Sequence, residues 1–228
     1  MRIGRAAYGG RRLAVLANEW FRRTTWTKDD QADFEARLAR ARKQNRAQYL
    51  RIQASHLMGA ANPKLTSAAL ELLNRMLAEY PSDIQVAQAH AQRAECHIRL
   101  GEVEKAIEAF RCALAREREF PNVRTTAWLE FGWLVIDRGL SQLYDEVLEV
   151  LTGFKDTMPF PVQRYRFHAI RALVAAERGA LANAREEAKQ ALEAGRATHS
   201  GFRYHPTLGL VRDTGSDIHS RLESLAGS

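Results

Sequence analysis

The chain has 228 residues, enough for one large domain or two small ones with a core of their own. Hydrophobic residues make up 46% and charged residues 27%, with only 14 Gly and 6 Pro, so the composition excludes a disordered chain and favours helices over a turn-rich β-sandwich. Two cysteines exclude a disulfide framework, and the apolar runs are too short for a membrane span, so we expect no membrane partner.

The net charge of +7 is concentrated at the N-terminal end. Residues 1–60 hold 13 Lys/Arg against 5 Asp/Glu, whereas the rest of the chain is close to neutral. Such an end attracts nucleic acid, anionic lipid or an acidic protein, or it is a solvated, arginine-rich helix face. Its apolar stretch LAVLA has only five residues, too few for a signal peptide, so we expect a cytoplasmic protein. An Arg-rich, acid-poor start is also typical of an organelle transit peptide.

The first predicted elements are a short helix over about 10–23 and a second helix over 28–43. Thr27 is a suitable N-cap for the second helix, and its apolar stripe is Phe34, Leu38 and Ala41. Three basic residues of this helix recur at intervals of three and trace a basic face: Arg37, Arg40 and Lys43. No sequence-reading motif accompanies them, so we expect at most weak, non-specific binding to nucleic acid.

Three later segments share one pattern, at 94–114, 132–151 and 172–192. Each has a small residue, a glycine seven positions later, and a second row of residues that begins five positions after that glycine. The glycines are Gly101, Gly139 and Gly179, and the second rows begin at Ala106, Tyr144 and Ala184. A weaker fourth copy lies upstream, with Leu57, Ala69, Leu73, Met76 and Pro81.

This pattern predicts helix–turn–helix units. Residues at i, i+4 and i+7 lie on one helix face, and small residues there let two helices approach closely. A glycine between the two helices ends the first one, because it adopts the left-handed C-cap conformation without steric cost. One unit cannot bury its apolar face alone, so we expect an all-α, antiparallel helix solenoid with extra helices at both ends.

These units resemble the tetratricopeptide repeat family, whose repeat of about 34 residues carries W-x2-L-G-x2-Y, then A-x3-F, then P. Residues 128–135 resemble the first half of this motif, and residues 106–110 resemble the second half. The units lie 37, 38 and 40 residues apart and Tyr144 replaces a small residue, so we expect longer helices or loops and altered packing in the third unit. The predicted organisation is a basic helical extension (1–46), about four repeats (47–195) and a capping segment (196–228).

The resemblance implies a concave groove that is lined by the first helix of each unit and holds a peptide or a helix of another protein. Carried over position by position, the expected partner-binding residues are Arg51, Met58, Gln88, Glu95, Arg99, Trp133, Asp137, Arg166 and Glu177. Some family members clamp a C-terminal carboxylate with Lys and Asn at two positions of this helix. Those positions are apolar or acidic here, so we expect no clamp and take Trp133 as the anchor.

A non-catalytic adaptor or scaffold for protein–protein interaction is the function that this groove favours. Two alternatives stay open: the basic N-terminal region binds nucleic acid or an acidic partner, or the protein is a small regulatory or immunity protein that blocks a toxin or an enzyme. The sequence holds no phosphate-binding loop, dinucleotide fingerprint, zinc-protease motif or serine-hydrolase motif, so we expect no enzyme activity, no cofactor and no metal.

Three groups of residues with reactive side chains are interpreted as structural. His90 and His97 lie two helical turns apart, about 10.5 Å by helical rise, which is too far for one zinc ion. Cys96 and Cys112 are expected to be buried free thiols. The third group lies in the turn-rich tail that leads into a helix expected over about 217–225: His199, Tyr204, His205, Asp213, Asp217 and His219. In this tail we expect Phe202, Tyr204 and Leu208 to form an apolar cap on the end of the repeats.

Overall fold

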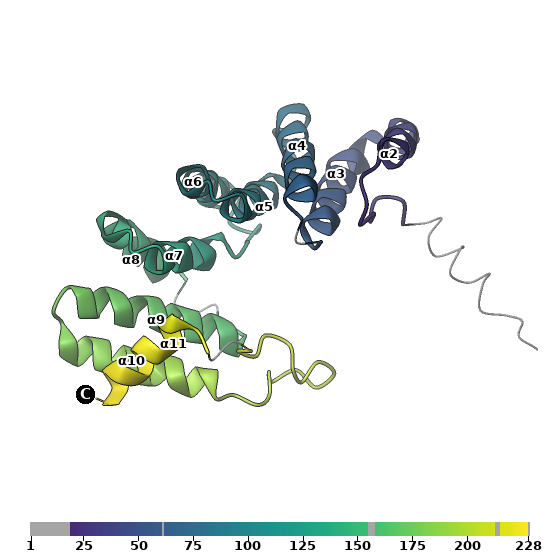
Figure 1. Cartoon of the computed structure of the whole chain (residues 1–228). Helices are drawn as coiled ribbons and strands as arrows, with labels where there is room; N and C mark the ends of the chain where they lie inside the picture. Colours follow the sequence, from purple (N-terminus) through teal and green to yellow (C-terminus); the bar gives the residue numbers. More distant parts are fainter. Residues whose placement is uncertain (1–18, 61, 155–157, 213–214, 228) are drawn as a thin grey trace, which may run out of the picture. The chain divides into compact units, whose positions relative to one another are not determined.

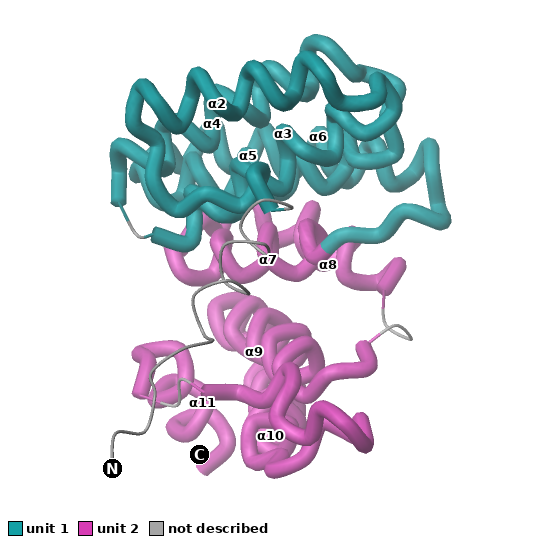
Figure 2. The backbone as a smooth tube through the Cα atoms, turned by 90° about the vertical axis from the view of Figure 1, so that its right-hand side faces the viewer, with its two compact units in different colours: residues 1–125 teal, residues 126–228 magenta. Residues whose placement is uncertain are grey.

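The computed structural model describes residues 19–60, 62–154, 158–212 and 215–227. These residues form ten α-helices, one short 3-10 helix and no strand, so the all-α prediction is confirmed for the described part of the chain. By packing, the chain divides into two compact units, Met1–Thr125 and Thr126–Ser228 (Figure 2). The boundaries predicted at 46 and 195 stay predictions.

The helices follow one another in chain order within each unit (Figure 1). In unit 1 they are α2 (Lys28–Arg40), α3 (Lys43–Met58), α4 (Pro63–Glu79), α5 (Val86–Arg99) and α6 (Val103–Glu119). In unit 2 they are α7 (Ala127–Asp137), the 3-10 helix η1 (Ser141–Leu143), α8 (Tyr144–Thr152), α9 (Pro161–Glu177), α10 (Leu181–Gly195) and α11 (Asp217–Gly227). The predicted helix over 10–23 lies mostly outside the described residues, and its described part, 19–23, is not helical.

Helices that are adjacent in the chain pack as pairs. The pairs are α3 with α4, α5 with α6, α7 with α8, and α9 with α10, while α11 packs on both helices of the last pair. Figure 1 shows α9 and α10 side by side, with α11 crossing them. Each pair buries an apolar face that neither helix could bury alone.

Thr27 caps α2 as predicted. Its hydroxyl accepts a hydrogen bond from the Asp30 N–H, and the Asp30 carboxylate accepts one from the Thr27 N–H, which completes a capping box. The bond from the Thr27 backbone is the main reason that the pKa of Asp30 falls to about 2. Phe34 and Leu38 are buried in the core of unit 1, as the apolar stripe predicts, and Ala41 is half-buried.

The predicted helix over 28–43 is wrong at its C-terminal end. α2 ends at Arg40, Ala41 is extended with a ψ of 151°, and α3 begins at Lys43. Arg46 of α3 donates from Nε to the carbonyl of Ala41 (3.0 Å) and from Nη2 to the carbonyl of Ala39 (2.6 Å). Carbonyls at the end of α2, which lack helical partners, therefore accept hydrogen bonds from a side chain of the next helix.

The predicted glycine turns are confirmed in three of the four helix pairs. The three glycines have positive φ angles: Gly101 at 77°, Gly139 at 63° and Gly179 at 75°. In each turn the residue after the glycine donates its N–H to the carbonyl five positions back, at 2.9 Å: Glu102 to His97, Leu140 to Val135, and Ala180 to Ala175. This is the long hydrogen bond of a Schellman motif, and it closes the first helix of each of these pairs.

Gly101→Ala is expected to lower the free energy of unfolding by about 1 kcal/mol, because an alanine Cβ is strained at a φ of 77°. Urea unfolding followed by circular dichroism measures the change. Gly153→Ala is the matched control, since Gly153 ends α8 at a φ of −70°, which any residue adopts. Equal losses in the two variants would contradict the left-handed turn.

The second helices of the pairs bury the rows that the repeat pattern predicts. In α4, α6 and α10 these rows are Ala69, Leu73 and Met76, then Ala106, Phe110 and Ala113, then Ala184, Ala188 and Ala191, all of them buried. The third pair differs at the position where Tyr144 replaces a small residue. There η1 precedes α8, and α8 has nine residues whereas α4 and α6 have 17 each.

Candidate binding pocket

Five of the predicted groove residues lie in unit 1, on α3 and α5. Arg51 of α3 donates from Nε to Gln85 Oε1 (2.6 Å) and from Nη1 to Gln92 Oε1 (3.3 Å). Gln92 lies on α5 and Gln85 directly precedes that helix, so Arg51 links α3 to α5. Burial lowers the pKa of the Arg51 guanidinium from its usual value. Gln88 is half-buried on the same helix as Gln92. These polar side chains connect two neighbouring helices.

Arg99 makes a second link between the same two helices. It forms an ion pair with Glu95 (2.7 Å) and donates to the backbone carbonyl of Met58 (2.9 Å) at the end of α3. The Met58 side chain is only 3% exposed and belongs to the core of unit 1. The expectation that Met58 lines an accessible groove is therefore wrong, because α3 turns this side chain into the core.

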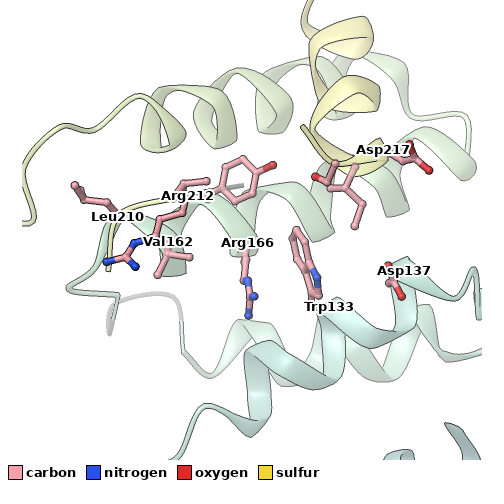
Figure 3. Close-up of a pocket in the computed structure, with 11 residues that line it drawn as sticks. Trp133, Asp137, Val162, Arg166, Leu210, Arg212 and Asp217 are labelled. Carbon is pink, nitrogen blue, oxygen red and sulfur yellow. The ribbon is translucent and has the colours of Figure 1, made fainter. Parts of the chain in front are cut away.

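The other four predicted groove residues lie in unit 2, and three of them come together. Trp133 and Asp137 of α7 and Arg166 of α9 line one pocket of about 470 Å³ (Figure 3). Glu177 does not line it: this exposed residue ends α9 and pairs with Arg221 of α11 (3.3 Å). Unit 2 thus places an aromatic ring and charges of both signs in one concave site.

Trp133 forms the aromatic centre of the pocket. Its indole is half-buried and rises from α7 toward α9 (Figure 3). The guanidinium carbon of Arg166 lies 4.9 Å from the centre of the indole ring, a cation–π contact, and Arg166 also pairs with Glu130 of α7 (2.6 Å). The ring of Tyr165 lies 6.2 Å from the indole. Trp133 is held in place from α9 and keeps part of its surface open.

The C-terminal segment supplies the remaining wall, which sequence reasoning missed. The residues it contributes are Leu210, Val211, Arg212, Ser216, Asp217 and Ile218. The carbonyl of Gly209 accepts a hydrogen bond from the Val162 N–H (2.8 Å), and Tyr165 Oη lies 3.1 Å from His219 Nδ1, so both ends of the segment are tied to α9. The spacing of Ile218 and Leu222 predicts a buried helix, but no sequence signal places 210–212 beside Trp133.

The reactive side chains of the C-terminal tail do not form one cluster. His199 Nδ1 accepts a hydrogen bond from the Gly201 N–H (2.9 Å), whereas His219 stacks on Tyr165, and Asp213 lies outside the described residues. Within the described ranges, no group of three or more His, Cys, Asp or Glu side chains could hold a metal ion.

The predicted apolar cap in this tail is wrong. Phe202, Tyr204 and Leu208 are 42%, 79% and 50% exposed, because the loop bends back on itself and closes with its own hydrogen bonds. Ile218 and Leu222 of α11 are buried in their place.

The paired histidines and cysteines have structural surroundings. Burial, with Arg93 and Arg116 nearby, lowers the pKa of His90 to about 4, so its imidazole is neutral at pH 7. His97 is buried and its Nδ1 lies 2.6 Å from a carboxylate oxygen of Glu102. Burial raises the pKa of the Cys96 thiol to about 12, which makes it a poor nucleophile. Cys112 is half-buried rather than buried.

The predicted basic face is not a single face. Arg37 pairs with Asp33 (2.9 Å), Arg40 donates from Nε to the carbonyl of Ala36 (3.0 Å), and Lys43 is the first residue of α3. The break at Ala41 separates the two arginines from the lysine, so the continuous basic band predicted on one helix is wrong. The arginines at positions 2, 5, 11 and 12 lie outside the described residues.

A scan against protein-family models, a search of curated proteins and a search of solved structures each found no match to this chain. None of the described helices is long and apolar enough to cross a membrane.

Proposed function

We propose that this chain is a tetratricopeptide-like repeat protein, an antiparallel helix solenoid that works as a non-catalytic adaptor for another protein. The three Schellman turns at Gly101, Gly139 and Gly179 support the repeat assignment, since the same hydrogen bond recurs at the spacing of the sequence repeat. The buried alanines on α6 and α10 support close packing between paired helices.

The observation that carries the binding proposal is the half-buried Trp133 in the pocket of unit 2. A volume of about 470 Å³ lies within the range of ligand pockets, about 300–1,000 Å³, and suits one or two side chains of a peptide or a partner helix. Tryptophan is enriched among the residues that dominate binding energy at protein interfaces. The cation–π contact with Arg166 already orients the Trp133 side chain in the free protein. Binding therefore costs less side-chain conformational entropy at this residue.

Trp133→Ala is expected to weaken peptide binding by at least about 2 kcal/mol, roughly 30-fold, with little loss of stability, because the ring is only half-buried in the free protein. The probes are peptides selected from a random-peptide phage library by panning on the full chain. Isothermal titration with the synthesised peptides gives the affinities of the wild type and the variant.

Tyr204→Ala is the matched control, because Tyr204 is an aromatic residue of unit 2 that is 79% exposed and does not line the pocket. Its affinity should equal that of the wild type. Peptides that bind Trp133→Ala as tightly as the wild type would contradict the pocket assignment. Unfolding of Trp133→Ala would show that the ring is a core residue.

A further inference from the structure

The charges around the Trp133 pocket are separated in space. Figure 3 shows Asp137 and Asp217 on the right of Trp133, and Arg212 on the left. The two carboxylates come from different elements, the last residue of α7 and the first residue of α11. Both residues line the pocket on the same side of Trp133, so this side of the pocket carries two carboxylates.

Both carboxylates are open to a ligand. Asp137 is 50% exposed and lies 3.2 Å from Arg138, which is 49% exposed, so solvent weakens the attraction between the two side chains. Asp137 is also the last residue of α7, so the partial negative charge of the helix end adds to that of its carboxylate. Asp217 is exposed and is the first residue of α11.

The basic side of the pocket is already compensated in part. Arg166 forms an ion pair with Glu130 at 2.6 Å and stacks on Trp133, so its charge is partly neutralised within the protein. Among the lining residues, Arg212 is the cation that remains. An anionic ligand would be repelled by two carboxylates and attracted by one arginine. A cationic ligand would be attracted by both carboxylates and repelled only by Arg212.

We infer that the partner of this pocket presents a lysine or arginine side chain. Its cationic end lies between Asp137 and Asp217, and its methylene groups cover the open part of the Trp133 indole, as long basic side chains do on apolar surfaces. This inference rests on the proposed function, because it names the chemistry of the partner at the same pocket.

The test uses the full chain and a random-peptide phage library, with Trp133→Ala as the counter-selection target. Peptides that the wild type retains and Trp133→Ala does not are expected to be enriched in Lys and Arg. The double variant Asp137→Asn/Asp217→Asn is expected to bind the synthesised peptides about tenfold more weakly at low salt, which equals about 1.4 kcal/mol. The difference should shrink at about 1 M salt, because the interaction is ionic and partly exposed.

Glu149→Gln is the matched control, since Glu149 is an exposed carboxylate on α8 outside the pocket. Its affinity should equal that of the wild type, and circular dichroism checks that all variants fold. Retained peptides without basic residues, or unchanged affinity in the double variant, would overturn the inference and leave the Trp133 pocket standing. If no peptide distinguishes the wild type from Trp133→Ala, the proposed function fails and the inference fails with it.

Discussion

Phe34→Ala is expected to lower the free energy of unfolding by about 3–5 kcal/mol, the range for removing a fully buried phenylalanine ring. Phe34 is 0% exposed. Its ring centroid lies 5.3 Å from those of both Trp20 and Trp26, and Trp20 in turn contacts Tyr49 at 5.1 Å. The variant therefore loses a buried ring and the contacts that hold residues 20–26 against α2 and α3.

Urea unfolding measures this loss, and tryptophan fluorescence gives an independent readout because two indoles touch the deleted ring. Their emission should shift to longer wavelength as they become hydrated. Phe120→Ala is the matched control in the same unit, since Phe120 is 43% exposed and the substitution should cost less than about 1 kcal/mol. A small loss in Phe34→Ala, with unshifted emission, would mean that the aromatic cluster does not stabilise unit 1.

Gly132→Leu is expected to destabilise unit 2 by about 2–3 kcal/mol through overpacking. A Cβ at Gly132 would lie 2.9 Å from Ile170 Cδ1 of α9 and 3.1 Å from Val147 Cγ1 of α8, so α7 approaches both helices at this point. Leucine has a better helix propensity than glycine, by close to 1 kcal/mol, which offsets part of the clash. Thermal unfolding followed by circular dichroism measures the net effect.

Gly132→Ala is the matched control for the leucine variant. Its single methyl group requires small shifts of the far end of Ile170 and of a Val147 methyl group, and the gain in helix propensity offsets their cost, so its stability should stay close to that of the wild type. A clear loss in the leucine variant, with alanine close to the wild type, indicates a close helix approach. A leucine variant as stable as the wild type would show that α7 does not pack closely on α8 and α9 at this residue.

The sequence by itself determined the features whose causes are local. The Thr27 cap needs only a hydroxyl followed by a carboxylate three positions later, and the turns at Gly101, Gly139 and Gly179 need only a residue that tolerates positive φ. The helical class follows from apolar periodicity, which short-range spacing records directly. For that reason the paired helices and their buried rows were predictable.

Tertiary structure decided where α2 ends and what encloses the pocket. Nothing in residues 28–43 breaks the helical pattern, but Arg46 from the next helix bonds the carbonyls of Ala39 and Ala41 and so fixes the end of α2. The wall formed by 210–212 lies beside Trp133 because the Gly209 carbonyl pairs with the Val162 N–H, a contact between residues 47 positions apart. Such long-range contacts leave no periodic signal in the chain, since the partners are chosen by packing and hydrogen bonding rather than by sequence spacing.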